Sequence, residues 1–141
     1  DDVAVLVVEP LSPPALRLEL PAEARQLAVL RRELRPWLRA QGLDEQDRHD
    51  VLIAVGEAAA NAIEHPRDPR RPSFVVEASL DGDELVVLIS DSGGWREPRL
   101  PTDRGRGMLF MRELMSEVEV RKGDAGTRVT LRRHIASRML T

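Results

Sequence analysis

Hydrophobic positions recur at helical spacing in two long stretches of the chain. In residues 22–41 leucines recur every three or four residues, and Gly42 predicts the end of this helix. Pro36 lies inside the pattern, so we expect a kink or a break there. A second helical stretch, residues 44–65, ends before Pro66. The pattern therefore predicts two long helices that follow one another closely.

Other stretches alternate between apolar and polar residues, which is the period of a β-strand. Residues 16–20 read Leu-Arg-Leu-Glu-Leu and predict a half-buried strand. Residues 74–80 and 85–91 flank the turn Asp81-Gly82-Asp83 and predict a hairpin. A second hairpin is predicted further on, with strands at 118–120 and 129–131 and a turn over 123–126.

The connections complete the expected architecture. Residues 66–72 are rich in proline and arginine and predict a loop, and residues 92–104 form the longest irregular polar stretch. Residues 105–116 again have a helical pattern. Two or three helices with about five mostly antiparallel strands predict an α+β fold, a two-layer α/β sandwich whose mixed sheet is covered by helices on one face.

The first residues suggest a domain boundary. Residues 1–8 have a strand pattern, and Pro10, Pro13 and Pro14 follow as in a linker. This segment is either an edge strand of the same domain or the end of a preceding one. Its Asp-Asp followed by a short apolar strand resembles the closing segment of PP2C-type serine phosphatases. We therefore expect a phosphatase remnant and linker over 1–14, the main domain over 15–135 and a tail over 136–141.

Composition narrows the function classes. The length of 141 residues fits one domain, and the absence of cysteine excludes disulfides, thiolate metal sites and cysteine nucleophiles. A net charge of -3 argues against a nucleic-acid-binding domain. The apolar runs are too short to cross a membrane. We expect a cytoplasmic protein in which Lys122, the only lysine, is the only residue available for lysine chemistry.

The second helix carries polar residues in an otherwise apolar surface. Glu57, Asn61 and Glu64 fall within about 60° around an ideal helix. Asn61 is unfavourable in mid-helix, and Gly56 costs about 1 kcal/mol there relative to alanine. This face is either solvated, as is usual for helical glutamates, or it is approached closely by a ligand.

Two glycine-containing segments follow. The strand ending in Ile89-Ser-Asp91 continues into Gly93 and Gly94, where the backbone either turns or approaches a ligand. The segment 103–111 reads Asp-Arg-Gly-Arg-Gly-Met-Leu-Phe-Met and leads into a helix. A helix start beside two arginines favours a phosphate group. The P-loop, the dinucleotide fingerprint and the protein-kinase motifs that need a strand lysine are all absent.

Together these segments resemble the N, G1, G2 and G3 boxes of the GHKL ATPase superfamily. The order is Glu57-x-x-x-Asn61-x-x-x-His65, then Asp91-x-Gly93, then Gly105-Arg-Gly107-Met-x-x-Met111, then Gly126-Thr127. The short lid and the Arg106-Gly107 helix start are most similar to anti-sigma-factor serine kinases. The resemblance covers about residues 16–133 and implies an α/β sandwich that holds ATP between its helices and a lid.

The resemblance also implies roles for individual residues. Asn61 would ligate Mg²⁺, and Glu57 would be the general base for the attacking hydroxyl. Asp91 would accept a hydrogen bond from the adenine amino group, with Gly93 making room for the ring. The remaining ATP contacts would come from the lid hinge, the helix start and the adenine end: Arg104, Gly105, Arg106, Gly107, Met108 and Thr127. Trp95 stands where the family often has a second glycine, so the lid contacts are expected to differ.

The expected function is that of an ATP- and Mg²⁺-dependent serine/threonine kinase in partner switching. It would phosphorylate an anti-sigma antagonist of the STAS type and sequester a sigma factor, with no nucleic-acid or membrane partner. The family usually dimerises, so a homodimer is among the expected assemblies. One alternative is an ATP-responsive anti-sigma binding module without useful phosphotransfer. A histidine-kinase-like ATP domain is disfavoured because no dimerising helix with an acceptor histidine precedes it.

Overall fold

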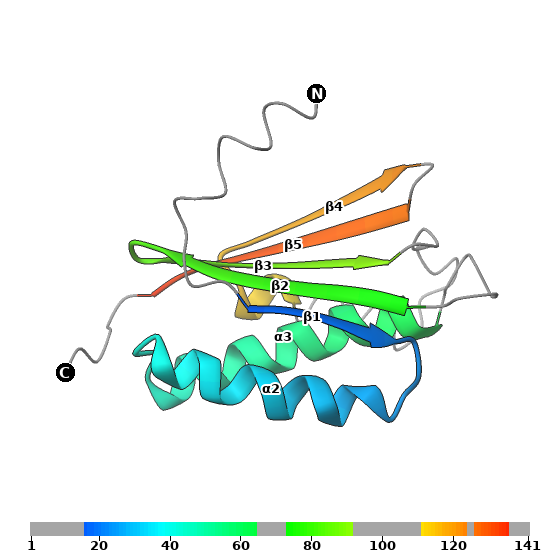
Figure 1. Ribbon diagram of the computed structural model, residues 1–141. Coiled ribbons are helices and arrows are strands. Elements are labelled where there is room, and N and C mark those ends of the chain that lie inside the picture. Colours follow the sequence, from blue (N-terminus) through cyan, green and yellow to red (C-terminus); the bar gives the residue numbers. More distant parts are fainter. Residues whose placement is uncertain (1–15, 65–72, 92–110, 124–125, 136–141) are drawn as a thin grey trace, which may run out of the picture.

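Two helices cover one face of a five-stranded sheet (Figure 1). The computed structural model describes residues 16–64, 73–91, 111–123 and 126–135. The helices are α2 (Gln26–Ala40) and α3 (Glu45–Glu64), and the strands are β1 (Leu16–Pro21), β2 (Ser73–Asp81), β3 (Glu84–Asp91), β4 (Glu117–Gly123) and β5 (Gly126–His134). The predicted two-layer α+β architecture is confirmed. None of the described helices is long and apolar enough to span a membrane.

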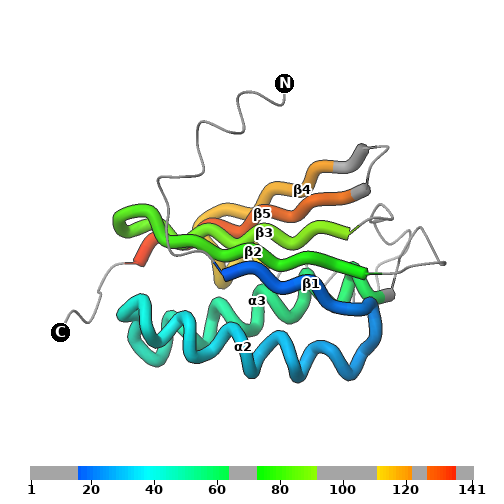
Figure 2. The backbone as a smooth tube through the Cα atoms, viewed as in Figure 1, coloured from blue at the N-terminus to red at the C-terminus, as the bar shows by residue number. Residues whose placement is uncertain are grey.

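The sheet has the order β1-β2-β3-β5-β4, and every pairing among the described strands is antiparallel (Figure 2). The predicted hairpin between β2 and β3 closes through Gly82 and Asp83, because Asp81 pairs directly with Glu84. Gly82 has a φ of 63°, a left-handed conformation that glycine adopts without strain. In the second predicted hairpin β5 lies between β3 and β4, which brings the start of β5 beside the end of β3.

The core forms between the helices and the inward face of the sheet. Alternate residues of each strand point toward the helices, and α3 turns mostly alanine and valine to the sheet, so the two layers can pack closely. The largest fully buried side chains come from both layers: Leu30, Leu34, Leu38, Leu43, Val51, Val55, Phe74, Leu85, Ile89, Met111, Leu131 and Ile135.

The first helix departs from its prediction in two ways. α2 begins at Gln26, later than the periodicity predicted. It continues through Pro36 as one helix, so of the predicted kink or break the break is wrong. Leu34 and Leu38, on either side of the proline, are both 0% exposed. Packing of these leucines outweighs the hydrogen bond that proline cannot donate.

The second helix agrees with its prediction. Gly42, with a φ of 89°, separates it from α2, and the Asp44 side chain accepts a 2.8 Å hydrogen bond from the Asp47 N–H as an N-terminal cap. Of the helix predicted over 105–116, the described part is its end at residues 111–114. The predicted domain boundary, the linker, the lid and the tail lie outside the described residues.

Candidate functional site

The C-terminal half of α3 carries the two polar residues on which the expected chemistry depends. Asn61 is 2% exposed and lies at the edge of the face that α3 buries, whereas Glu57, one turn earlier, is half-buried. On an ideal helix the two side chains are about 40° apart. Glu57 therefore stands at the boundary between the buried face and solvent, directly beside Asn61.

The Asn61 side-chain oxygen lacks a hydrogen-bond partner in the described part of the chain. Its Oδ1 atom is buried, and no described residue donates a hydrogen bond to it. An amide oxygen buried in this way costs about 1–3 kcal/mol, and such groups are rarely left alone in native proteins. A bound ion or ligand can supply a partner for this oxygen.

The donor set of α3 fits Mg²⁺. No group of three or more histidine, aspartate or glutamate side chains among the described residues is arranged to hold a metal ion. Mg²⁺ does not require such a cage, because it keeps several waters and binds proteins through one or two oxygens plus substrate phosphates. The buried Asn61 oxygen is a ligand of the hard type that this ion prefers.

The sheet brings two further predicted residues together. Asp91, the last residue of β3, pairs directly with Thr127 near the start of β5. Directly opposed residues of an antiparallel pair share a face of the sheet, with Cβ atoms about 4.5–5.5 Å apart. Asp91 is 9% exposed and Thr127 is 3% exposed. Each lies two positions from an inward-facing residue of its own strand, Ile89 on β3 and Val129 on β5. The pair places a carboxylate and a hydroxyl on the helix-facing side of the sheet.

All four residues belong to one end of the molecule. Figure 1 shows the C-terminal ends of α3 and β3 and the start of β5 on the right-hand side of the view. α3 contacts both β3 and β5, the strands that carry Asp91 and Thr127. The fold therefore places Glu57, Asn61, Asp91 and Thr127 toward the same end of the molecule, although they come from segments far apart in the sequence.

A groove of about 410 Å³ opens beside Glu57 on the outer side of the helix layer. Its apolar lining includes Ile53, an exposed hydrophobic residue, and Gly56, at which an added Cβ would meet no atom within 4 Å. The remaining lining is Leu27, Arg31, Arg35, His49, Leu52 and Ala60. This groove was not predicted from the sequence, although Arg31 and Arg35, one turn apart on the first helix, indicated a basic strip on its surface.

Six of the predicted site residues lie outside the described residues. These are Gly93, Arg104, Gly105, Arg106, Gly107 and Met108, so their roles stay predictions. The structure does describe the last turn of the helix that was predicted over residues 105–116. Met111, in that turn, is fully buried in the core.

Comparisons with known proteins identify the family. Residues 20–133 match the family described as "Histidine kinase-like ATPase domain". Serine-protein kinase RsbW from Bacillus velezensis is 26% identical over 137 residues, covering 85% of this chain and 85% of that protein. Serine-protein kinase RsbW from Staphylococcus aureus (strain MRSA252) is 25% identical over 138 residues, covering 85% of this chain and 86% of that protein.

A solved structure also matches. The crystal structure of the RsbU and RsbW domains of Rv1364c from Mycobacterium tuberculosis superposes with a TM-score of 0.74 and 29% identity over 91% of this chain. The match takes up 35% of the mycobacterial chain, so this chain spans about a third of its length. The resemblance drawn from the four sequence boxes is confirmed, and ATP binding is implied by it. The chain belongs to the histidine kinase-like ATPase family and is a distant homologue of the RsbW serine-protein kinases.

Proposed function

We propose that this protein transfers the γ-phosphate of ATP to a serine or threonine of an anti-sigma antagonist. The observation that carries the proposal is the buried Oδ1 atom of Asn61, which has no partner among the described residues and lies one turn from the half-buried Glu57. A solvated helix face, the alternative for these residues, would leave the asparagine oxygen in contact with water. Burial of that oxygen favours a ligand.

Glu57 is the proposed general base. Its carboxylate would accept the proton of the attacking hydroxyl while that oxygen forms a bond to the γ-phosphorus. The bond from the γ-phosphorus to the ADP oxygen breaks, and ADP leaves with the electron pair. Phosphoryl transfer needs mainly positioning and charge neutralisation, so few protein groups have to take part.

The remaining contacts hold the nucleotide. Asn61 would hold Mg²⁺ through its buried Oδ1, and the ion would supply positive charge at the phosphates. Asp91 would accept a hydrogen bond from the adenine amino group, and Thr127, directly opposite it, would support the same end of the nucleotide. Contacts from Gly93 and residues 104–108 are proposed from the family resemblance alone.

The protein partners follow from the RsbW relatives. We propose a STAS-type antagonist as the phosphate acceptor and a sigma factor as the sequestered partner, acting in the cytoplasm, with a homodimer as the assembly. The groove beside Glu57 gives a protein segment a route to the base from the outer side of α3. Arg31 and Arg35 line that groove without an ion-pair partner in the described part of the chain, which suits an acidic segment.

The test is a phosphotransfer assay with Mg-ATP and the STAS-domain antagonist from the same genome. Phosphoserine or phosphothreonine on the antagonist, located by mass spectrometry, is the expected result. ATP binding and sigma-factor binding without any phosphate on the antagonist would instead identify an ATP-responsive binding module.

A further inference from the structure

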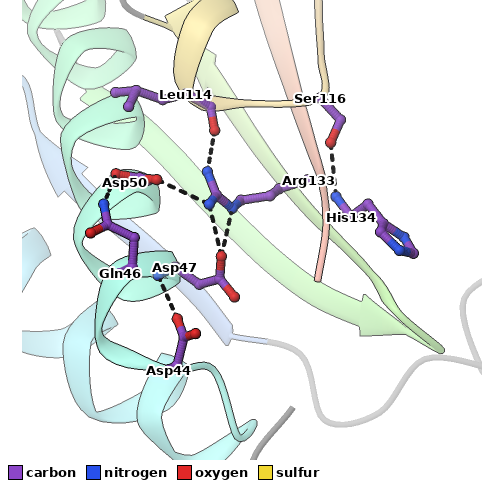
Figure 3. Close-up of polar contacts among 8 residues, drawn as sticks. All are labelled: Asp44, Gln46, Asp47, Asp50, Leu114, Ser116, Arg133 and His134. Atoms are coloured by element: carbon purple, nitrogen blue, oxygen red, sulfur yellow. Dashed lines mark hydrogen bonds and ion pairs between the residues drawn. The ribbon is translucent and has the colours of Figure 1, made fainter. Parts of the chain in front are cut away.

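Arg133 joins three elements through one partly buried guanidinium (Figure 3). It projects from β5 toward α3, where Nη2 and Nε donate to Asp47 Oδ1 at 2.7 and 3.1 Å, and Nη2 lies 3.0 Å from Asp50 Oδ2. Nη1 donates to the carbonyl oxygen of Leu114. The side chains of Arg133, Asp47 and Asp50 are 16%, 12% and 14% exposed.

The neighbouring arginine shows that this burial is particular to Arg133. Arg132 points to the other face of β5, where it is 36% exposed and pairs at 3.4 Å with Glu84 and at 3.9 Å with Glu117. Exposed pairs of this kind contribute little to stability. Loss of one partner of the Arg133 cluster is more costly, because breaking a buried pair leaves an uncompensated charge.

Arg133 donates hydrogen bonds to groups at the ends of two helices. Leu114 is the last residue of its helix, so its carbonyl has no partner within the helix and the dipole there favours a cation. Asp47 lies in the first turn of α3, where the dipole favours an anion. A second link follows directly, because the His134 N–H donates to Ser116 Oγ at 2.9 Å. Arg133 therefore fixes the end of the helix at Leu114 against the start of α3.

The same side of α3 carries the proposed site. Asp50, Glu57 and Asn61 fall within about 40° around an ideal helix, so the Arg133 contact and the site residues share one stripe of α3. α3 is one uninterrupted helix from Glu45 to Glu64, in which Asp50 lies about two turns before Glu57 and three turns before Asn61. The helix held at Leu114 also inserts the fully buried Met111 into the core.

We propose that Arg133 is a positioning residue for nucleotide binding. By holding the Leu114 helix end on the stripe of α3 that carries Glu57 and Asn61, it sets the spacing between the elements around the site. This inference rests on the proposed nucleotide site. It predicts that a change at Arg133 lowers ATP affinity in a protein that remains folded.

Arg133→Lys is the most informative variant, with Arg132→Lys as its matched control. Lysine can still pair with Asp47 or Asp50, but it lacks the planar fork that also reaches the Leu114 carbonyl. We expect near-native far-UV circular dichroism and a rise of about 3- to 30-fold in the Kd for Mg-ATP, the range for coupling through packed networks. Arg132→Lys should bind Mg-ATP as the wild type does.

Hydrogen exchange without nucleotide tests the contact independently of the proposed function. Amides of residues 111–116 should exchange faster in Arg133→Lys than in Arg132→Lys, while α2 amides stay unchanged. If Arg133→Lys does not fold, Asp50→Asn removes one of the two carboxylate charges and should give smaller shifts in the same directions. A folded variant with wild-type ATP affinity, or with wild-type exchange at 111–116, would overturn the inference. A wild-type protein that binds no ATP would instead refute the proposed function, and the exchange result would still decide whether Arg133 holds the helix.

Discussion

At the scale of single residues, the proposed site depends on the burial of ordinary polar side chains, above all that of Asn61. The sequence indicated that Asn61 is unfavourable in mid-helix, but it left a solvated face as an alternative. The structure adds that its Oδ1 atom is buried and that no residue in the described ranges pairs with it. The pairing of Asp91 with Thr127 could not be predicted from local sequence, because it follows from the register between β3 and β5. The candidate residues could therefore be selected from the sequence, whereas their arrangement in space could not.

Asp91→Asn tests the adenine contact. The substitution keeps the size of the side chain but exchanges a charged acceptor for an amide that presents a donor as well. ATP affinity should fall by about 1–3 kcal/mol, as expected when a charge-assisted hydrogen bond is mismatched. Isothermal titration with Mg-ATP measures this, with Asp81→Asn at the exposed end of β2 as the control. Equal affinity in Asp91→Asn and the wild type would remove the adenine assignment.

At the scale of elements, α3 combines a packing face with a face that borders the groove. Its buried side is mainly alanine and valine, while Ile53, Gly56 and Glu57 line the groove. Close approach to Gly56 was one of the readings of the sequence. The space next to Gly56 is open, and no described residue approaches it.

Gly56→Ala tests this reading of the helix. Because an added Cβ would meet nothing within 4 Å, the gain in helix propensity of about 1 kcal/mol should raise the melting temperature by a few degrees. ATP affinity should not change, and phosphorylation of an antagonist that docks in the groove should slow. Gly82→Ala is the opposite control, since its φ of 63° should make alanine destabilising. A lower melting temperature for Gly56→Ala would show that the space is needed for folding.

At the scale of the whole molecule, local patterns predicted most elements but not their order in the sheet. Strand alternation predicted both hairpins, leucine spacing predicted the first long helix, and the second was also predicted. The insertion of β5 between β3 and β4 depends on packing between distant segments, and so does the unbroken course of α2 through Pro36. Arg133 was overlooked for the same reason. The sequence pattern that could have identified it is an arginine on the same face of β5 as Val129 and Leu131, which point toward the helices.

A truncation tests the proposed boundary near the N-terminus. Among the described strands, β1 begins at Leu16 and pairs along its length with β2. Removal of residues 1–10 should leave the melting temperature and ATP affinity almost unchanged. Removal of residues 1–18, which takes away half of β1, should lower the melting temperature. A loss of several degrees in the shorter truncation would show that residues 1–10 belong to this domain.

The most direct measurement is a paired titration and phosphotransfer assay on Asn61→Ala and Glu57→Ala. Asn61→Ala should lose Mg²⁺-dependent ATP binding and turnover together, since it removes the metal ligand. Glu57→Ala should keep most of its ATP affinity but transfer phosphate about 10²–10⁴-fold more slowly, the usual effect of losing a general base. Glu45→Ala, an exposed glutamate in the first turn of the same helix, should match the wild type. Wild-type binding and turnover in both site variants would contradict the account and make this side of α3 a solvated face.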